Sequence, residues 1–363
     1  MENVFYIISL LLILVNILPF IPHQHWIFRV FDFIRIQLLA LQFPLLLIGF
    51  VFIENQNVLF WTVQSSLAIL TVYNSYLLIP FTPIYRIRRE KSIENNSELI
   101  SVLSVNVHQF NHEFQRLIDL IHEVKPDIIL TMESNKNWEQ ALSVLDQAYP
   151  NYQKIAMENT YGMHFYSKLK TIRKQIHYFV ANDLPSMEID LETHNKTIFT
   201  LFCVHPAPPS PTEEETSKER DGELLSIAKK VRKLNNPVIV TGDFNNVAWA
   251  RSSVLFRKTS KLIDPRIGRG FVSTFHARYK LMRFPIDLFF HSTDIFIEEF
   301  KTLRHIGSDH LPLYCSFVIN FKNSSQEQLV EELEKGEMAE VNEMIEEARE
   351  VESNRPAIAH DEK

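Results

Sequence analysis

The first 85 residues are almost continuously apolar, and charged side chains become frequent only from Arg86 onward. Three stretches in this region, residues 4–22, 36–53 and 58–79, each approach the ~20 residues that a helix needs to cross a bilayer core. A cleavable signal peptide fits the first stretch less well, because a basic leader and a small-residue cleavage site are missing and further apolar stretches follow. Residues 1–85 are therefore predicted to form a membrane domain with three transmembrane helices.

Basic residues that flank these stretches predict how the domain is oriented. Arg29 and Arg35 lie between the first two stretches, and the sequence RIRREK follows the third at residues 86–91. Since short cytoplasmic loops are enriched in Lys and Arg, the N-terminus is expected outside and the large C-terminal part on the cytoplasmic side of a multi-pass membrane protein. Residues 86–97 form a basic and polar linker.

After the linker, the hydrophobic pattern changes to that of a mixed α/β domain over residues 98–320. Short apolar runs bounded by turn residues predict strands, and apolar positions at helical spacing predict helices. Strands are predicted at 98–107, 127–133, 161–168, 171–179, 186–192, 196–205, 237–245, 271–275, 285–291 and 311–319, and helices at 113–124, 138–145 and 218–234. Three consecutive strands within 171–205 suggest an antiparallel meander. Since many strands are continuous apolar runs, typical of burial on both faces, two packed sheets with helices outside, an α/β sandwich, are expected.

The net charge of -7 is concentrated at the C-terminus. Residues 324–363 contain 13 acidic and 4 basic side chains, so the rest of the chain has a small positive excess. Residues 321–363 therefore form an acidic tail, whose apolar positions predict a solvated amphipathic helix, with a partner-binding or coiled-coil helix as the alternative. The protein partner of such a tail is unknown. The acidity says little about the substrate, and a strongly basic block that would indicate nucleic-acid binding is absent.

Polar residues with catalytic potential lie at the ends of the predicted strands. They are Asn106, Glu133, His205, Asp243 with Asn245, and the adjacent pair Asp309 and His310. Each of these alone is usually a turn former or a structural side chain. Asp287, inside the apolar sequence FPIDLFF, needs a partner because an unpaired buried charge costs several kcal/mol, and a histidine is its natural partner. Together, acids and polar groups at several strand ends indicate a metal-assisted hydrolytic site.

The same residues, in the same order, resemble the endonuclease/exonuclease/phosphatase superfamily, which includes DNase I-like nucleases, sphingomyelinases and inositol-polyphosphate phosphatases. The resemblance covers residues 98–320 and rests on Asn106, Glu133 in TMES, His205 in VHPAPP, GDFN at 242–245, PID at 285–287 and SDH at 308–310. The preceding apolar helices and Trp249 after GDFN look most like bacterial membrane-anchored members. The resemblance implies a four-layer α/β/β/α sandwich (DNase I-like) and a bacterial inner membrane as the location.

The resemblance also implies a role for each site residue. Glu133 and Asn106 would bind a divalent cation, Mg²⁺ or Mn²⁺, with Asp309 next to the metal. His310, held by Asp287, would act in general acid/base chemistry. Asp243 would orient or deprotonate the attacking water, Asn245 would bind the phosphate, and His205 would donate to a phosphate oxygen.

These roles predict a membrane-tethered, metal-dependent phosphoesterase that hydrolyses a phosphodiester or phosphomonoester by in-line attack of water. The lipid bilayer around three N-terminal helices makes a lipid-like phosphoester an attractive substrate. One alternative is a nuclease acting on DNA or RNA, which would need basic residues along its cleft. The candidates look scattered: Lys168, Lys170, Arg173, Lys174, Arg251, Arg257 and Lys258. A second alternative is an inactive membrane scaffold that recruits a partner through its acidic tail.

Overall fold

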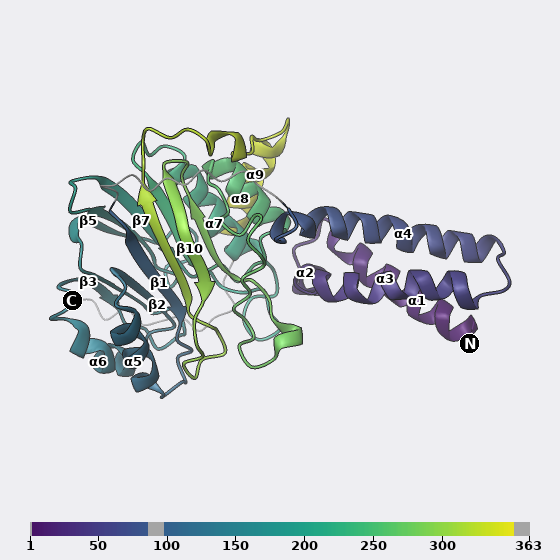
Figure 1. Cartoon of the computed structure of the whole chain (residues 1–363), viewed down its shortest axis with the longest axis horizontal. Coiled ribbons are helices and arrows are strands. Elements are labelled where there is room, and N and C mark those ends of the chain that lie inside the picture. Colours follow the sequence, from purple (N-terminus) through teal and green to yellow (C-terminus); the bar gives the residue numbers. More distant parts are fainter. Residues whose placement is uncertain (1, 86–97, 352–363) are drawn as a thin grey trace.

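The computed structural model describes residues 2–85 and 98–351. A rod of long helices projects from one end of a rounded α/β body (Figure 1). The linker predicted at 86–97 and the end of the acidic tail, 352–363, lie outside the described residues.

The rod is built from residues 2–81. Its N-terminus lies at the end farthest from the body (Figure 1). One long helix therefore runs toward the body, the next runs away from it and the third returns. The helices are α1 (Glu2–Ile17), continued by a short turn to Phe20, α2 (Trp26–Phe33), α3 (Arg35–Phe52) and α4 (Val58–Leu78). The short α2 lies at the end of the rod next to the body.

Among the residues described, two segments of the rod are long and apolar enough to cross a membrane, Glu2–Phe20 and Arg35–Phe52. The third predicted segment forms α4, which is 21 residues long but less apolar. Gln64, Asn74 and several Ser and Thr residues lower its mean hydropathy. The structure thus provides two candidate spanning helices where the sequence predicted three.

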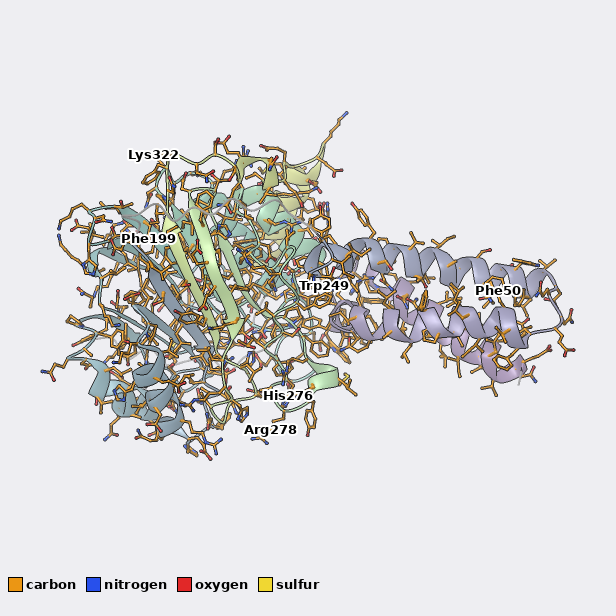
Figure 2. The ribbon with its side chains drawn as sticks, viewed as in Figure 1. Phe50, Phe199, Trp249, His276, Arg278 and Lys322 are labelled. Atoms are coloured by element: carbon orange, nitrogen blue, oxygen red, sulfur yellow. The ribbon has the colours of Figure 1, made fainter. Side chains whose placement is uncertain are left out.

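The rod is apolar outside, and its interior combines an apolar cluster, including Phe60 and Leu67, with buried polar side chains. Asn16, Gln42 and Asn74, one from each long helix, are buried. The Asn74 amide nitrogen donates to Asn16 Oδ1 at 2.7 Å and to Gln42 Oε1 at 2.9 Å. Large apolar side chains are exposed along the outside, among them Ile7, Leu11, Leu47, Phe50, Val51, Ile69 and Val72; Phe50 is labelled in Figure 2. Helical bundles in water instead direct polar faces outward.

Two β-sheets pack face to face in the described part of the body. The strand order is β10-β11-β1-β2-β4-β3 in the first sheet and β5-β6-β7-β8-β9 in the second. The first sheet consists of β1 (Ile100–Asn106), β2 (Ile128–Met132), β3 (Asn151–Ile155), β4 (Met163–Ser167), β10 (Ile295–Thr302) and β11 (Leu313–Ile319). The second consists of β5 (Lys170–His177), β6 (Ser186–Glu192), β7 (Ile198–Val204), β8 (Val238–Asp243) and β9 (Asp287–His291). Apolar side chains of both sheets, such as Phe165, Leu201 and Phe317, form the central core.

Helices cover the outer face of each sheet. They are α5 (Phe114–Val124) and α6 (Lys136–Leu142) on the first sheet, and α7 (Lys218–Val231), α8 (Arg251–Ser260) and α9 (Glu337–Arg349) on the side of the second. Trp138 and Leu117 are buried under the first sheet, and Leu224 and Phe256 under the second. The body is therefore a four-layer α/β/β/α sandwich, as predicted.

Most predicted strands are present, and the meander is confirmed because β5, β6 and β7 pair antiparallel. The strand predicted at 271–275 is wrong. In this segment Phe275 makes isolated bridges to Phe284 and His310, and Val272 adopts a left-handed conformation (φ 46°) that interrupts an extended strand. The sequence analysis also missed β3, β10 and α8, whose sequences carry many charged or polar residues.

The acidic tail contains a packed helix, which differs from the solvated helix expected. Val341, Ile345 and Ala348 of α9 are buried, the first two in the cluster that also contains residues of α7 and α8. A Cβ atom on Gly222 of α7 would lie 2.1 Å from Cβ of Ala348, so glycine is needed where the two helices meet. Burial of this apolar face, about 25 cal/mol per Å², favours docking over solvation.

Ion pairs fix the acidic side chains of the tail to α8. Arg251 Nη1 lies 2.8 Å from Glu337 Oε1, Arg257 Nη2 lies 2.8 Å from Glu331 Oε1, and Lys258 Nζ lies 3.1 Å from Glu337 Oε2. The Lys258–Glu337 pair is largely shielded from water, so screening weakens it less than an exposed pair. Three of the basic residues considered for a nuclease are thus engaged by the protein's own tail.

The rod joins the body at the edge where several catalytic candidates lie. Loops 246–250, 206–217 and 276–286 contact its near end. The contacts are a hydrogen bond of 2.7 Å from Trp249 Nε1 to Asp32 O, one of 2.8 Å from Ser217 N to Gln24 O, and an edge-on packing of Phe284 against Phe33. Figure 2 labels Trp249 at this junction.

Candidate active site

Strand pairing brings the predicted residues to one edge of the sandwich. β1 and β2 are parallel and place Asn106 opposite Met132, so Glu133 follows beside Asn106. β7 and β8 are parallel and place Val204 opposite Gly242, so His205 and Asp243 follow at the same edge. β9 is antiparallel to β8 and places Asp287 opposite Asp243. The register therefore explains how residues from distant parts of the sequence converge.

The backbone turns sharply at three positions beside this edge. His108, Glu133 and Asn245 have φ values of 58°, 59° and 50°. Non-glycine residues rarely adopt this left-handed region, and each such residue costs of order 1–3 kcal/mol. A strained backbone of this kind persists only where the surrounding structure holds it in place, and it is common at functional sites.

Asn106 links two carboxylates at the centre of the site. Its Nδ2 donates to Glu133 Oε1 at 2.8 Å and to Asp243 Oδ2 at 3.0 Å. The backbone N–H of Gln109 donates to Glu133 Oε2 at 3.1 Å, which fixes the second carboxylate oxygen. Gln109 was not predicted, although its position just after the first strand was a usable signal.

His310 is held by two buried carboxylates. Its Nδ1 shares a hydrogen bond of 2.7 Å with Asp287 Oδ2, and its Nε2 lies 3.5 Å from Asp243 Oδ2. The structure thus gives Asp287 the histidine partner that the sequence predicted. Ser308, which was not predicted although it lies within the SDH motif, accepts a hydrogen bond from His310 N at 3.0 Å and donates to Asn106 O at 2.7 Å.

Asp243 and His310 are both buried, and each changes the pKa of the other. Burial raises the pKa of Asp243 to about 6, against the opposing effect of His310. Burial alone would lower the pKa of His310, but Asp287 and Asp243 outweigh it and raise that pKa to about 10. At neutral pH the imidazole is therefore held as an imidazolium between carboxylates, with its proton on Nδ1 directed at Asp287.

His205 and Asn245 also lie beside Asp243. His205 Nε2 is 3.9 Å from Asp243 Oδ2, and burial lowers the pKa of His205. The backbone N–H of Asn245 donates to Asp243 Oδ1 at 2.9 Å, and its side-chain amide donates to Pro206 O at 3.0 Å. A neutral histidine and an amide beside the central carboxylate are suited to hydrogen bonding with phosphoryl oxygens.

Asp309 is the least integrated of the predicted residues. Its side chain is half-buried, with Oδ1 3.4 Å from Ser308 Oγ, and its carbonyl oxygen accepts from Ala277 N at 2.6 Å. Among the contacts of the described residues, none joins the Asp309 carboxylate to Glu133 or Asn106. Its placement next to a metal therefore stays a prediction.

Two arrangements at this edge could hold a divalent cation. Asp243, Asp287 and His310 each offer a ligand atom within 4.8 Å of the others. In that group, however, His310 Nδ1 is already hydrogen-bonded to Asp287. Glu133, Asn106 and Asp243 offer oxygen donors, which hard cations such as Mg²⁺ prefer. The Asn106 amide nitrogen faces both carboxylates, and its oxygen accepts from His108 N at 2.9 Å. Asn106 can therefore offer its oxygen to a cation only if the amide turns and gives up that hydrogen bond, whereas the Glu133 carboxylate already provides a suitable donor.

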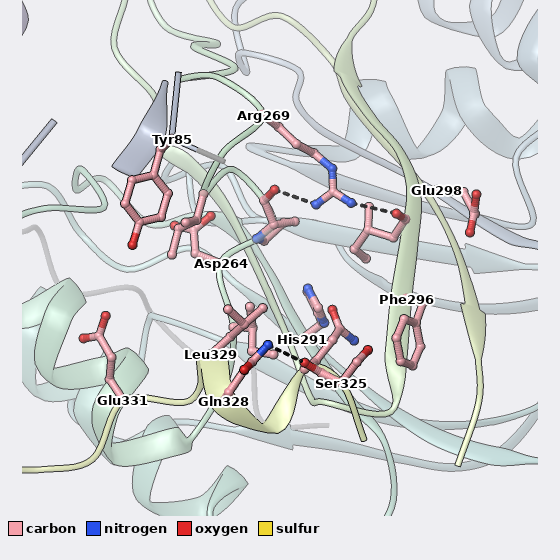
Figure 3. Close-up of a pocket in the computed structure, with 15 residues that line it drawn as sticks. Tyr85, Asp264, Arg269, His291, Phe296, Glu298, Ser325, Gln328, Leu329 and Glu331 are labelled. Atoms are coloured by element: carbon pink, nitrogen blue, oxygen red, sulfur yellow. Dashed lines mark hydrogen bonds between the residues drawn. The ribbon is translucent and has the colours of Figure 1, made fainter. Parts of the chain in front are cut away.

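The hollow in Figure 3 is separate from this site and has a volume of about 220 Å³. None of the predicted catalytic residues lines it. Arg269 donates to Pro265 O and Ile297 O at 2.7 and 2.8 Å across the hollow, and burial lowers the pKa of His291 to about 4. These polar groups of the hollow make local hydrogen bonds. We assign the catalytic chemistry to the edge around Asp243.

Comparisons with known proteins identify the family and the fold. Residues 103–310 match the profile described as the Endonuclease/Exonuclease/phosphatase family. A D. rerio TDP2 structure complexed with a single-strand DNA product is 16% identical with a TM-score of 0.52 and covers 61% of this chain and 99% of that chain. A family protein from Bacteroides thetaiotaomicron is 18% identical with a TM-score of 0.52, covering 63% and 98%. The human Nocturnin catalytic domain with a bound sulfate anion is 16% identical with a TM-score of 0.50, covering 62% and 98%.

At these identities the solved structures establish a shared fold. None of the curated proteins compared matches the chain. The matched residues begin in β1 and end at His310, so they include every predicted site residue.

Proposed function

Because the chain belongs to the endonuclease/exonuclease/phosphatase family, we propose that it is a membrane-tethered, divalent-metal-dependent phosphoesterase that cleaves a phosphodiester close to the bilayer. One observation carries the proposal. The Asn106 amide joins Glu133 to Asp243, and His310 lies 3.5 Å from the same Asp243 carboxylate. This combines an oxygen-rich cation position with a carboxylate–histidine pair.

The chain's own residues suit in-line attack of water on phosphorus. Asp243 would orient the water and accept its proton, and its raised pKa makes it a stronger base than an ordinary aspartate. His310 would protonate or stabilise the leaving oxygen, with Asp287 fixing its tautomer and orientation. His205 and Asn245 would bind the non-bridging phosphoryl oxygens.

Glu133 and Asn106 would hold the cation, Mg²⁺ or Mn²⁺, with Asp309 next to it. When bound, the ion supplies neutralisation of negative charge on the phosphoryl group and its leaving oxygen. The hydrogen bond from Gln109 N keeps Glu133 turned toward this position.

The apolar exterior of the rod supports the membrane tether. The segment Glu2–Phe20 has 19 residues, and a helix of this length extends about 28 Å, close to the ~30 Å of a bilayer core. Buried polar side chains that hydrogen-bond between helices are typical of membrane bundles. α4 shares this feature, because its polar residues Gln64 and Asn74 are buried.

Charges at the two ends of the rod support the orientation predicted from the sequence. Glu2 and Glu54 lie at the far end, and Arg29 and Arg35 lie at the end next to the body. No Asp, Glu, Lys or Arg occurs in residues 3–28 or 36–53. By the positive-inside rule, the body would be cytoplasmic.

The basic residues singled out in the sequence give the nuclease alternative little support. The basic residues considered for a nucleic-acid cleft have partners within the protein. These include Lys170 with Glu192, Arg173 with Glu188 and Asp190, Arg251 with Glu337, and Arg257 with Glu331. Phosphate contacts in a nuclease would require such side chains to be available.

The test is turnover of methyl 4-nitrophenyl phosphate, a soluble phosphodiester, by the full chain with Mg²⁺. We expect EDTA to stop release of nitrophenol, and His310→Ala to lower the rate by at least about 100-fold. A rate that survives both changes, or no turnover with any divalent cation, would overturn the proposal. A matched control is His194→Ala, which changes a histidine in the β6–β7 turn, away from the site edge.

A further inference from the structure

The loop before β9 connects the candidate active site directly to the helical rod. At one end, Ala277 N donates to Asp309 O at 2.6 Å, and Phe275 forms a bridge with His310. At the other end, Gln37 Nε2 of α3 donates to Leu281 O at 2.8 Å. The loop therefore touches both the catalytic residues and the start of an apolar helix.

The tip of this loop exposes large apolar side chains. Leu281 is 87% exposed, Tyr279 63% and Met282 48%. Arg278 and Lys280 are also exposed between them. In Figure 1 the tip is the short green helix that lies beside the end of the rod, and Figure 2 labels Arg278 and His276 on the same loop.

The apolar, aromatic and basic side chains of this tip favour the boundary between a bilayer and water. Exposed Leu and Met side chains lower their free energy by entering the acyl boundary of a bilayer, because their apolar surface is then removed from water. Tyr, Lys and Arg favour the headgroup level, where the aromatic ring is amphipathic and the cations meet anionic phosphate. The contact with Gln37 places the tip beside the second residue after Arg35, near the start of α3.

We propose that residues 276–283, the interfacial loop, lie on the bilayer surface and present a phospholipid-like phosphodiester to the site. This inference rests on the proposed function and names its substrate class. The phosphoryl group would reach Asp243 and His310 while the acyl or alkyl chain stays in the bilayer. The water oxygen forms a new bond to phosphorus and passes a proton to Asp243, the bond from phosphorus to the leaving oxygen breaks, and that oxygen takes up a proton from His310.

The experiment compares two chromogenic phosphodiesters that share the reacting group and the 4-nitrophenolate leaving group. One is methyl 4-nitrophenyl phosphate in solution, and the other is hexadecyl 4-nitrophenyl phosphate in vesicles of phosphatidylcholine and phosphatidylglycerol. The full chain is reconstituted into the same vesicles with Mg²⁺. The substitutions are Leu281→Glu in the interfacial loop and, as a matched control, Val144→Glu, which is 62% exposed near α6.

We expect Leu281→Glu to lower the rate on the hexadecyl ester at least tenfold and to change the rate on the methyl ester less than twofold. Val144→Glu should change neither rate. Equal effects of Leu281→Glu on both esters, or no effect on either, would overturn the inference. If the unsubstituted protein fails to hydrolyse even the methyl ester, the proposed function fails instead, so the two failures are distinguishable.

A second measurement tests the position of the loop without turnover. A nitroxide label attached at Leu281→Cys reports its surroundings, and the native Cys203 and Cys315 are buried and should stay unlabelled. In the vesicles, we expect collisions with lipid-soluble oxygen to exceed collisions with a water-soluble nickel chelate. The reverse order, matching a label at Val144→Cys, would contradict the proposed membrane contact.

Discussion

The carboxylate of Asp287 accepts a hydrogen bond from His310 Nδ1 at 2.7 Å inside an apolar strand. Asp287→Asn would keep the shape of this contact but remove the negative charge that orients the imidazole and keeps it protonated. We expect kcat on methyl 4-nitrophenyl phosphate to fall by about 100- to 10,000-fold. Asp119→Asn, an exposed change on α5, should leave kcat unchanged; a comparable loss there would mean that the effect is not specific.

The same substitution should also change the pH dependence of the remaining activity. Asp287 and Asp243 raise the pKa of His310, which keeps its proton bound at neutral pH. Because loss of an anionic neighbour lowers a histidine pKa, the alkaline decrease in kcat should move to lower pH in Asp287→Asn. If the decrease in kcat at alkaline pH does not move, a group other than His310 controls it.

Glu223 of α7 gives a prediction about stability. Its carboxyl group is buried and accepts a hydrogen bond from Ser186 Oγ at 2.7 Å. Burial raises its pKa to about 8, so the folded protein binds this proton more tightly than the unfolded chain. The contribution of Glu223 to stability is therefore largest at low pH and decreases as the pH rises from the ordinary carboxyl range toward 8.

Glu223→Gln cannot ionise and should remove this decrease. In urea unfolding, we expect the variant to be more stable than the unsubstituted protein by on the order of 2 kcal/mol at pH 8, and by clearly less at pH 5. The exposed Glu346→Gln should show no pH-dependent difference. An equal difference at both pH values for Glu223→Gln would contradict the assigned pKa.

Some residue-scale features were accessible from the sequence, and others were not. A carboxylate within FPIDLFF requires a partner, which correctly predicted that Asp287 contacts a histidine. The left-handed backbone of Glu133 and Asn245 was not accessible, because their local sequences contain no glycine at these positions and the conformation is imposed by tertiary contacts.

At the scale of elements, the docking of α9 on α7 gives a further prediction about stability. Ile345 is buried in this contact. Ile345→Ala should lower the free energy of unfolding by about 2–4 kcal/mol, because it removes packed methylene groups and leaves a cavity. Glu346→Ala, its exposed neighbour on the same helix, should change it by less than ~0.5 kcal/mol. A negligible effect of Ile345→Ala would mean that the tail helix is solvated, as the sequence suggested.

The hydrophobic pattern predicted buried elements well and marginal ones poorly. Continuous apolar runs such as those of β2 and β8 are buried along their whole length and were identified. β10 continues through Glu298 and Glu299, whose charges hide its pairing with β11. Whether α9 is solvated or docked depends on the facing surface of α7, including Gly222, which the local pattern does not reveal.

At the scale of the whole molecule, a membrane-spanning rod would place its two ends on opposite sides of the membrane. The native Cys203 and Cys315 are buried, so an introduced cysteine can be labelled selectively. In intact spheroplasts, a membrane-impermeant maleimide should label Asn3→Cys and should label Lys322→Cys only after permeabilisation. Labelling of both sites in intact cells would contradict a membrane-spanning rod with a cytoplasmic body.

The arrangement of rod and body explains why the site lies close to the predicted bilayer. Trp249, four residues after Asn245, donates to Asp32 O, and Phe284, three residues before Asp287, packs against Phe33. Segments that leave the catalytic strands thus bind the base of the rod. The sequence predicted both units separately, but this contact depends on loops whose conformation has no repeating pattern.

The central claim is that a divalent cation binds at Glu133 and Asn106, while Asp287 and His310 act in proton transfer. Its most direct test is the rate of methyl 4-nitrophenyl phosphate hydrolysis as a function of Mg²⁺ concentration. Loss of a carboxylate ligand should weaken cation binding strongly, so Glu133→Gln should raise the half-saturating Mg²⁺ concentration at least about tenfold. Asp287→Asn should lower the maximal rate and leave that concentration within about twofold. The opposite result, in which Asp287→Asn shifts the Mg²⁺ dependence and Glu133→Gln does not, would place the cation at Asp243, Asp287 and His310 and contradict the account.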